Sequence, residues 1–358
     1  MGRLPSRFEA RPCEKGGDVV AGKARPTTLQ SIADRLGLHV STVSRVLNGS
    51  TGDGGRAASS RTAQRIRELA HDLGYRPNPY ATSLRTQRSN LIGVLVPRLS
   101  DPVLAFIYEG VEDAATDHGL STFVTNTQDD ARIQEARTNM ALDRRVDGLI
   151  FADGREDTGL LDRISAQEIP FVLVNRHVGD HPAITCDNRL GGRLVAEHFL
   201  ERGYENVAVI AGPSYASTAV DRTAGFTARY EEAGITIPES MVVESAFDTA
   251  GGRRAAERIL RGRTAPIAIF AVNDFAAIGA AGCARDHGLM VGTDIAIAGF
   301  NDTPLAPELP VPLTSVRTPV HEMGRGAVEM LVRLLAGNTA ESRLLPPALV
   351  IRESSLLD

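Results

Sequence analysis

Residues 28–48 constrain this chain more than any other stretch, because they have the pattern of two short amphipathic helices joined by a tight turn. Four apolar residues recur at the spacing of one helical face: Leu29, Ile32, Ala33 and Leu36. Gly37 allows the turn, and Val43 anchors the inner face of the second helix. The pattern is typical of a helix-turn-helix that reads DNA, and an ordinary helical hairpin with a solvated serine-rich face is the alternative.

The second helix and the local charge both favour DNA. Its exposed side chains are small hydroxyls and one guanidinium, groups suited to phosphates and base edges: Ser41, Thr42, Ser44 and Arg45. Residues 1–89 hold 15 Arg and Lys against 7 Asp and Glu, a net charge of +8, although the whole chain carries −5. A basic N-terminal module on an acidic body is expected when one small domain meets nucleic acid.

Length and composition bound the remaining possibilities. The 358 residues suffice for two or three domains, and no apolar run is long enough to cross a membrane. Residues 1–26 have no apolar signal core, so we expect a disordered tail and a cytoplasmic, nucleoid-associated protein. Cys13, Cys186 and Cys283 are odd in number and scattered, which fits reduced thiols.

The segment after the paired helices is a loop followed by a third helix. Residues 49–58 are rich in glycine and polar side chains, so they cannot form a helix interior. Beyond them, a third apolar helical face ends at Gly74, with prolines following: Ile66, Leu69, Ala70 and Leu73. Three small helices therefore form the predicted head.

From Asn90 onward, short apolar runs alternate with helical segments such as Val103–His118. The runs are 91–96, 122–125, 148–151, 171–174, 207–211, 267–270 and 295–300. Because apolar runs without alternation are typical of strands covered on both faces, they predict parallel strands in doubly wound sheets. The length accommodates two such sheets.

Four stretches together resemble the lac repressor (LacI/GalR) family of transcriptional regulators over residues 27–358. They are 28–49, LGYRPNPYATSLRT at 73–86, 90–115 and GFNDTPLAPELPVPLTSVRTP at 299–319. The resemblance implies a small all-α helix-turn-helix head and an α/β core of two doubly wound parallel-sheet subdomains of periplasmic-binding-protein type. Two departures stand out: the loop at 49–58 is about five residues longer than in similar sequences, and His39 replaces the usual serine-type cap.

The resemblance also implies the domain boundaries. The head spans 27–76, a hinge helix or linker spans 77–89, and the effector-binding and dimerisation core spans 90–358. Within the core, the N-subdomain comprises about 90–186 and 318–343, and the C-subdomain about 187–317 and 344–358.

In that family, the DNA sequence is read by the first residues of the recognition helix and by a later arginine-type position. The resemblance assigns this role to Val40, Ser41 and Arg45. Thr42 and Ser44 then contact phosphates, and Leu84 matches the leucine wedged into the minor groove by the hinge helix. The full set of candidate DNA-contacting residues is Thr28, Val40, Ser41, Thr42, Ser44, Arg45, Asn48, Tyr75 and Leu84. The expected partners are pseudo-palindromic operator DNA and a second copy of the chain.

Ligands of doubly wound sheets bind beyond the carboxyl ends of the strands, which directs attention to polar residues after each apolar run. By resemblance, Arg222 matches an effector-binding arginine and Phe247 an aromatic that stacks on the ligand. The candidate effector-binding residues are Asp101, Asn175, Arg222, Phe247, Asn273, Asp274 and Asn301. For each one other than Arg222 and Phe247, a strand-end turn or cap is an equal alternative. A sugar or related metabolite is the expected effector, and both release and corepression fit the sequence.

No motif for catalysis stands out in the core. It contains no P-loop, no usable dinucleotide glycine pattern and no G-x-S-x-G, and His321-Glu322 lacks the second histidine of a zinc helix. We therefore expect no enzymatic activity, no cofactor and no metal site. A sugar-binding protein without DNA function would explain 90–358 and leave the basic head unexplained.

Overall fold

The computed structural model describes residues 27–47, 58–75, 88–261 and 267–357. The chain divides into two compact units, Met1–Arg85 and Thr86–Asp358, and each is described by itself. Among the described helices, none combines the length and apolarity needed to cross a bilayer.

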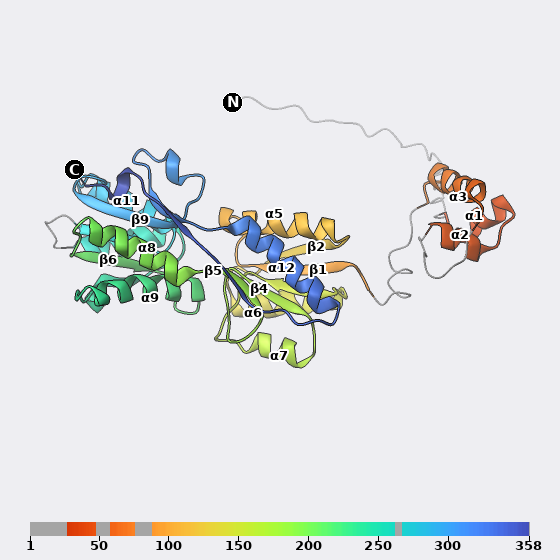
Figure 1. The fold of residues 1–358 in the computed structure, drawn as a ribbon, viewed down its shortest axis with the longest axis horizontal. Helices are drawn as coiled ribbons and strands as arrows, with labels where there is room; N and C mark the ends of the chain where they lie inside the picture. Colours follow the sequence, from red (N-terminus) through yellow and green to blue (C-terminus); the bar gives the residue numbers. More distant parts are fainter. Residues whose placement is uncertain (1–26, 48–57, 76–87, 262–266, 358) are drawn as a thin grey trace, which may run out of the picture. The chain divides into compact units, whose positions relative to one another are not determined.

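The first unit is a three-helix head, coloured red to orange in Figure 1. Its helices are α1 (Leu29–Leu36), α2 (Val40–Leu47) and α3 (Ser60–Asp72). They enclose a small core of fully or nearly fully buried side chains: Ile32, Ala33, Val43, Ile66 and Ala70. Gly37 has φ +64°, the left-handed conformation that glycine adopts without strain, and it turns the chain from α1 toward α2. The helix-turn-helix predicted from the sequence is confirmed.

The second unit contains two six-stranded sheets. The first has the order β11-β5-β4-β3-β1-β2 and the second the order β12-β10-β9-β8-β6-β7. The strands of the first are β1 (Leu91–Val96), β2 (Ser121–Asn126), β3 (Gly148–Phe151), β4 (Phe171–Val174), β5 (Ala183–Cys186) and β11 (Arg343–Leu345). Those of the second are β6 (Val207–Ala211), β7 (Val242–Glu244), β8 (Ile267–Ala271), β9 (Ile295–Asn301), β10 (Thr314–Arg317) and β12 (Ala348–Val350). Among the described residues, the strands pair in parallel except β12 with β10, so the two doubly wound sheets are confirmed.

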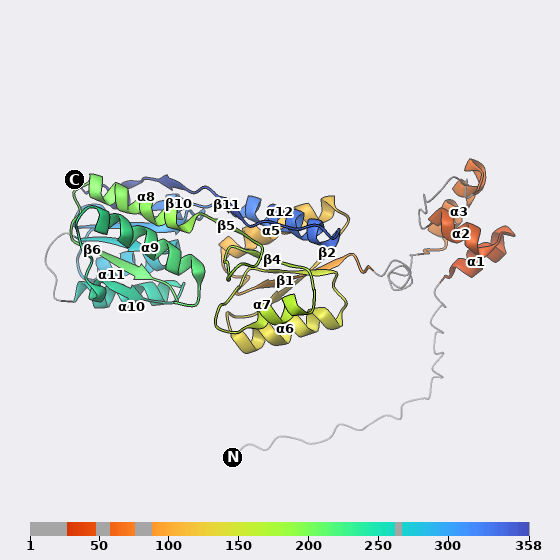
Figure 2. The same ribbon diagram turned by 60° about the horizontal axis from the view of Figure 1, so that its bottom comes forward.

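Helices cover both faces of each sheet, as Figure 2 shows. The first sheet packs α5 (Pro102–Asp117) and α12 (Val320–Leu335) on one face and α6 (Ala131–Asp143) and α7 (Leu160–Ala166) on the other. The second packs α8 (Asn188–Glu201) and α9 (Ser217–Glu232) on one face and α10 (Thr249–Leu260) and α11 (Asp274–Asp286) on the other. This double cover explains why the strand sequences are continuously apolar.

In the part of the second unit that the structure describes, the chain passes between the sheets at 187, at 318–319 and at 346–347 (Figure 1). The third passage differs from the sequence-based boundary at 343/344, which divides β11. Arg343, Leu344 and Leu345 all pair in register with β5, so the first sheet extends through Leu345. The backbone pairing of β11 with β5 fixes this boundary. The three residues of β11 have no sequence pattern that would indicate it.

Candidate functional site

A cavity of about 430 Å³ lies between the two subdomains of the second unit, at the carboxyl ends of their parallel strands. Residues from both sheets line it. Six residues singled out from the sequence are among the lining: Asp101, Asn175, Arg222, Phe247, Asn273 and Asn301. Because ligands of doubly wound sheets bind at this end of the strands, the cavity is the candidate ligand site.

Arg222 is a deeply buried charge in the lining of the cavity. Its side chain is buried, Nε donates a hydrogen bond to Asn188 Oδ1 at 2.8 Å, and Nη1 donates to the carbonyl oxygen of Val272 at 2.8 Å. The guanidinium carbon lies 3.8 Å from the centre of the Phe300 ring. Burial lowers the pKa of Arg222 to about 10. These contacts fix the guanidinium plane, and the group still lines the cavity.

The close packing of α8 against α9 sets the position of Arg222. A Cβ on Gly192 would lie 2.1 Å from the Arg222 carbonyl oxygen, and one on Gly225 would lie 2.0 Å from the carbonyl oxygen of Arg189. Only glycine permits the two backbones to approach this closely. Arg222 therefore projects from a helix that is held against the helix carrying its partner Asn188.

A second polar cluster, which the sequence analysis missed, joins the two subdomains across the cavity. Asp129, which follows β2, accepts two hydrogen bonds from Arg176, at 2.7 and 2.9 Å, and one from the Tyr215 hydroxyl at 3.1 Å. Burial raises the pKa of Asp129, but the hydrogen bonds and charge of Arg176 outweigh it and the pKa is lowered. The cluster is therefore an ion pair at neutral pH, held by a tyrosine of the other subdomain.

The guanidinium of Arg155 completes this cluster. It lies 3.8 Å from the centre of the Tyr215 ring, and Nη1 donates to the Asp129 carbonyl oxygen at 2.7 Å. Asp157 holds the other side of the same guanidinium through two hydrogen bonds of 2.9 and 2.7 Å. The sequence signal for this cluster was slight, since only Arg176 directly followed a recognised apolar run.

Two of the predicted residues also cap helices. Asp101 precedes α5 and its Oδ1 accepts from the Val103 backbone N–H at 3.0 Å. Asn273 precedes α11, accepts from the Ala276 N–H at 2.7 Å, and donates from Nδ2 to the Phe247 carbonyl oxygen at 3.1 Å. Asn273 thus holds the backbone of the aromatic residue that lines the same cavity.

Asn175 and Asn301 lie at strand ends in the left-handed region, with φ of 69° and 104°. Asparagine tolerates this conformation better than most residues with a Cβ. The backbone therefore supplies a reason for amide side chains at these two strand ends.

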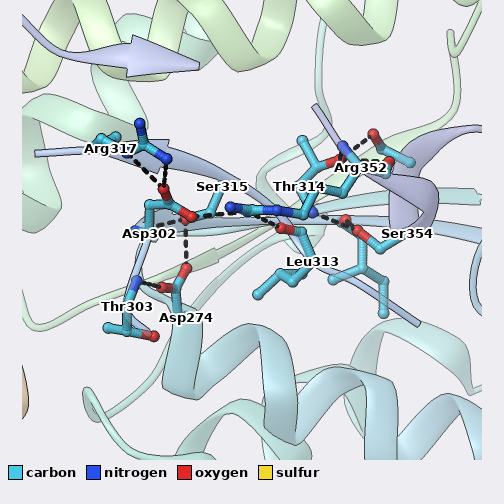
Figure 3. Close-up of polar contacts among 11 residues, drawn as sticks. Asp274, Asp302, Thr303, Leu313, Thr314, Ser315, Arg317, Arg352 and Ser354 are labelled. Atoms are coloured by element: carbon cyan, nitrogen blue, oxygen red, sulfur yellow. Dashed lines mark hydrogen bonds and ion pairs between the residues drawn. The ribbon is translucent and has the colours of Figure 1, made fainter. Parts of the chain in front are cut away.

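Asp274, also predicted as an effector-binding residue, is not among the residues that line the cavity. Figure 3 shows its carboxylate turned toward Thr303 and Ser315. Oδ2 accepts from the Thr303 backbone N–H at 2.7 Å and Oδ1 accepts from the Ser315 hydroxyl at 2.6 Å. Burial raises the pKa of Asp274 to about 6, against the opposing effect of these hydrogen bonds. Asn273 is the N-cap of α11 and has an extended backbone, whereas Asp274 is the first residue of the helix, so the two side chains point in different directions.

Beside Asp274, an ion-pair cluster centred on a buried carboxylate ties the end of β9 to two other segments. The Asp302 side chain, 4% exposed, lies 2.8 Å from Nη2 of Arg317 and 2.7 Å from Nη1 of Arg352 (Figure 3). Arg317 ends β10 just before the second passage between sheets, and Arg352 follows β12. Asp302 directly follows Asn301 at the end of β9. Its two ion pairs therefore join this strand end to the segments that connect the two sheets.

In the head, the candidate DNA-contacting residues of α2 are partly or fully exposed: Val40, Ser41, Thr42, Ser44 and Arg45. Thr28 caps α1, since its hydroxyl accepts from the Ser31 N–H at 3.2 Å. Tyr75 follows α3 and donates its backbone N–H to the Ala70 carbonyl oxygen at 2.8 Å. Asn48 and Leu84 lie outside the described residues. Across the described ranges, no cluster of three or more His, Cys, Asp or Glu is placed to hold a metal ion.

Two family models match the chain. Residues 28–78 match bacterial regulatory proteins of the lacI family, and residues 196–355 match the periplasmic binding protein-like domain. The HTH-type transcriptional regulator DegA of Bacillus subtilis is 32% identical over 336 residues, which is 92% of this chain and 98% of the relative. The HTH-type transcriptional repressor PurR of Photobacterium profundum is 29% identical over 334 residues, 91% of this chain and 98% of the relative.

Solved structures agree with these relatives. The lac repressor dimer bound to operator and the anti-inducer ONPF is similar with a TM-score of 0.84 and 27% identity, covering 93% of this chain and 100% of that chain. The transcriptional regulator CelR in complex with cellobiose has a TM-score of 0.70 and 28% identity, covering 92% and 100%. On its identity to DegA over nearly the full length of both chains, this protein belongs to the lacI family of bacterial regulatory proteins.

Proposed function

We propose that the protein is a ligand-responsive, sequence-specific DNA-binding transcriptional repressor. The observation that carries the proposal is the cavity lined by both subdomains, on the same chain as a helix-turn-helix head. The layout is a head at 27–76, a hinge at 77–89 and a two-subdomain core at 90–358. A cytoplasmic location, where DNA is accessible, follows from this role.

The chemistry of the cavity fits a small polyhydroxylated metabolite such as a sugar. Arg222 presents fixed donors, while Asn175 and Asn301 can both donate and accept hydrogen bonds. Phe247 and Tyr215 supply flat apolar rings beside these polar groups. A ring that carries hydroxyls has both a face for stacking and an edge for such hydrogen bonds.

On the DNA side, we infer that Val40, Ser41 and Arg45 read base edges while Thr42 and Ser44 contact phosphates. Their exposure on α2 supports this assignment, because base and phosphate contacts require accessible side chains. A homodimer fits best, since a two-fold axis presents two heads to the two halves of a pseudo-palindromic operator. Leu84 as a minor-groove wedge, and Asn48 and Tyr75 as further contacts, belong to the same proposal.

The mechanism follows from thermodynamic linkage. If the effector binds between the subdomains, it favours the arrangement in which both line the cavity, and that arrangement changes how paired heads meet DNA. Operator then alters effector affinity by the same factor that effector alters operator affinity. The residues of this chain that hold the two subdomains together therefore set the response.

A gel-shift assay on the DNA upstream of the protein's own gene tests the proposal, with and without a panel of sugars and nucleosides. We expect a sequence-specific complex whose midpoint shifts with one compound of the panel. A protein that binds a sugar tightly and forms no specific DNA complex would instead be a binding protein without DNA function.

A further inference from the structure

The helix α2 begins beside a histidine whose ring contacts the residue two positions on. His39 Nδ1 lies 3.3 Å from the backbone nitrogen of Ser41 and 2.8 Å from Ser41 Oγ. The His39 carbonyl oxygen accepts from the Thr42 backbone N–H at 2.9 Å. His39 therefore caps α2, and two donor groups of Ser41 converge on one ring nitrogen.

These partners determine which ring nitrogen carries the hydrogen. A backbone N–H can only donate, so Nδ1 must be the unprotonated acceptor and the ring hydrogen must be on Nε2. Since Nδ1 has no hydrogen to give, the Ser41 hydroxyl is the donor in the 2.8 Å contact. A hydroxyl has one hydrogen and two lone pairs, so Ser41 Oγ keeps only acceptor capacity.

Other neighbours leave this assignment unchanged. Arg45 Nε donates to the Ser41 carbonyl oxygen at 3.3 Å, and not to its hydroxyl. Within the described part of the head, Ser41 Oγ contacts His39 Nδ1. Ser41 is exposed, so its free lone pairs face the medium that DNA would occupy.

We propose that His39 makes Ser41 a pure hydrogen-bond acceptor, so that Ser41 reads an exocyclic amino group in the major groove. The groups that can donate there are N6 of adenine and N4 of cytosine, whereas N7, O6 and O4 of the bases only accept. A serine without such a neighbour can rotate its hydroxyl to donate or accept, and reads these edges with less discrimination. His39 is thus a positioning residue that narrows specificity. The proposal rests on the proposed function, in which α2 enters the major groove.

The first step of the test identifies the base pair that faces Ser41. The full-length protein selects sites from a randomised duplex library, in parallel with Ser41→Ala. The position whose preference disappears in Ser41→Ala is the one that Ser41 reads. Circular dichroism of each variant confirms that the head remains helical.

The second step removes single groups from that base pair. Adenine is replaced by purine nucleoside, which lacks the N6 amino group, or cytosine by its analogue without the N4 amino group. Matched duplexes carry 7-deazapurine, which lacks the N7 acceptor. We expect loss of the amino group to weaken binding about 3- to 10-fold, the ratio given by one neutral hydrogen bond, and to cause no comparable loss in Ser41→Ala. Loss of N7 should affect both proteins equally.

The third step tests His39 itself. In His39→Asn the side-chain oxygen can accept from the same Ser41 groups, so the dependence on the amino group should persist. In His39→Ala the hydroxyl is released, and the selected sites should become less restricted at that one position. A head that is merely destabilised would instead lose affinity uniformly across sequences.

Three results would overturn the proposal: no Ser41-dependent position, coupling of Ser41 to N7 instead of the amino group, or unchanged discrimination in His39→Ala. Each of these leaves the proposed function standing as long as the library yields an enriched two-part site. Absence of any enriched site would overturn the proposed function instead.

Discussion

The hydroxyl of Tyr215 donates a hydrogen bond to Asp129 at 3.1 Å, and this contact joins two residues from different subdomains that both line the cavity. Tyr215 follows β6 of the second sheet, whereas Asp129 follows β2 of the first. Arg176 and Arg155 hold Asp129 and the Tyr215 ring in place from the first subdomain. The arrangement in which both subdomains line the cavity is therefore stabilised by the protein's own side chains.

Tyr215→Phe should weaken effector binding without abolishing it. The change keeps the ring that Arg155 covers and removes one hydrogen bond to a charged group, a contribution of about 1.5–3 kcal/mol when fully realised. Water can replace part of the lost hydrogen bond to Asp129, and subdomains that are apart do not make this bond at all. We therefore expect roughly a 3- to 30-fold rise in effector Kd. Isothermal titration calorimetry measures it.

Tyr108→Phe is the matched control for this prediction. Tyr108 also bonds through its hydroxyl, to Glu112 at 2.7 Å, but it lies on α5 away from the cavity lining. Its removal should leave effector Kd unchanged. Equal losses in both variants would mean that the Tyr215 contact has no special part in closing the cavity.

The arrangement in which both subdomains line the cavity, called the closed arrangement below, should depend on pH through His177 and Asp221. His177 follows β4, its backbone N–H donates to the Ser217 hydroxyl at 2.9 Å, and its Nε2 lies 2.8 Å from Asp221 Oδ2 on α9. The hydrogen bond and charge of Asp221 raise the pKa of His177; Glu156 acts in the same direction and Arg189 opposes it. Burial raises the pKa of Asp221, but His177 and Arg189 outweigh it and lower that pKa.

These directions set the sign of the pH dependence. A histidine pKa that is raised in the closed arrangement favours closure at pH values below its ordinary range, and the benefit is lost as pH rises through the raised pKa. Effector affinity should thus fall over the pH interval that starts at the ordinary histidine range near 6.5 and extends through the raised pKa of His177. His177→Gln keeps a side-chain donor without the titration, so its affinity should be flat across that interval. A wild-type profile that is equally flat would contradict the prediction.

Arg222→Ala and Phe247→Ala should uncouple the DNA complex from the effector. The first removes the fixed donors, and the second removes a flat apolar surface. Both residues lie in the second unit, so specific DNA binding should persist while its response to effector disappears or requires much higher concentrations. Gel shifts with increasing effector measure the response. Loss of DNA binding in both variants would point to a structural role, which thermal unfolding would reveal.

Asp302→Asn should destabilise the second unit. It removes the charge that holds Arg317 and Arg352 from a side chain only 4% exposed. A fully buried ion pair typically costs about 3–5 kcal/mol to break, but the Arg317 side chain is 61% exposed, so we expect a smaller loss that still lowers the urea midpoint. Asp286→Asn removes ion pairs that are exposed and screened by solvent, so it should leave the urea midpoint nearly unchanged. Similar midpoints for the two variants would contradict the assignment.

Arg45→Ala should weaken specific DNA binding by about 1–3 kcal/mol while largely sparing random DNA, if its guanidinium reads a base edge. Arg45 is exposed on α2, with its Nε directed to the Ser41 carbonyl oxygen. Competition gel shifts with specific and random duplexes separate the two contributions. Equal losses on both would make Arg45 a phosphate contact.

Local sequence determined the elements of this protein. The spacing of Ile32, Ala33 and Val43 predicted the helix-turn-helix because a helical period depends only on neighbours along the chain. The apolar runs predicted strands such as β1 and β9 because both faces of these sheets are covered. Polar residues next to the runs, such as Asn175 and Asn273, predicted the edge of the sheet at which the cavity lies.

Tertiary structure alone decided which side chains meet in the cavity. Asp129 meets Arg176 and Tyr215 from 47 and 86 residues away, a distance over which no sequence period operates. Asp274 follows Asn273 directly yet turns to Ser315, because Asn273 is the N-cap with an extended backbone and Asp274 is the first residue of α11. The short strand β11 joined the first sheet through its ladder to β5. The sequence determines local periodicity. Long-range strand pairing and the position at which a helix begins decide which neighbouring polar side chains face the cavity and which form hydrogen bonds elsewhere in the structure.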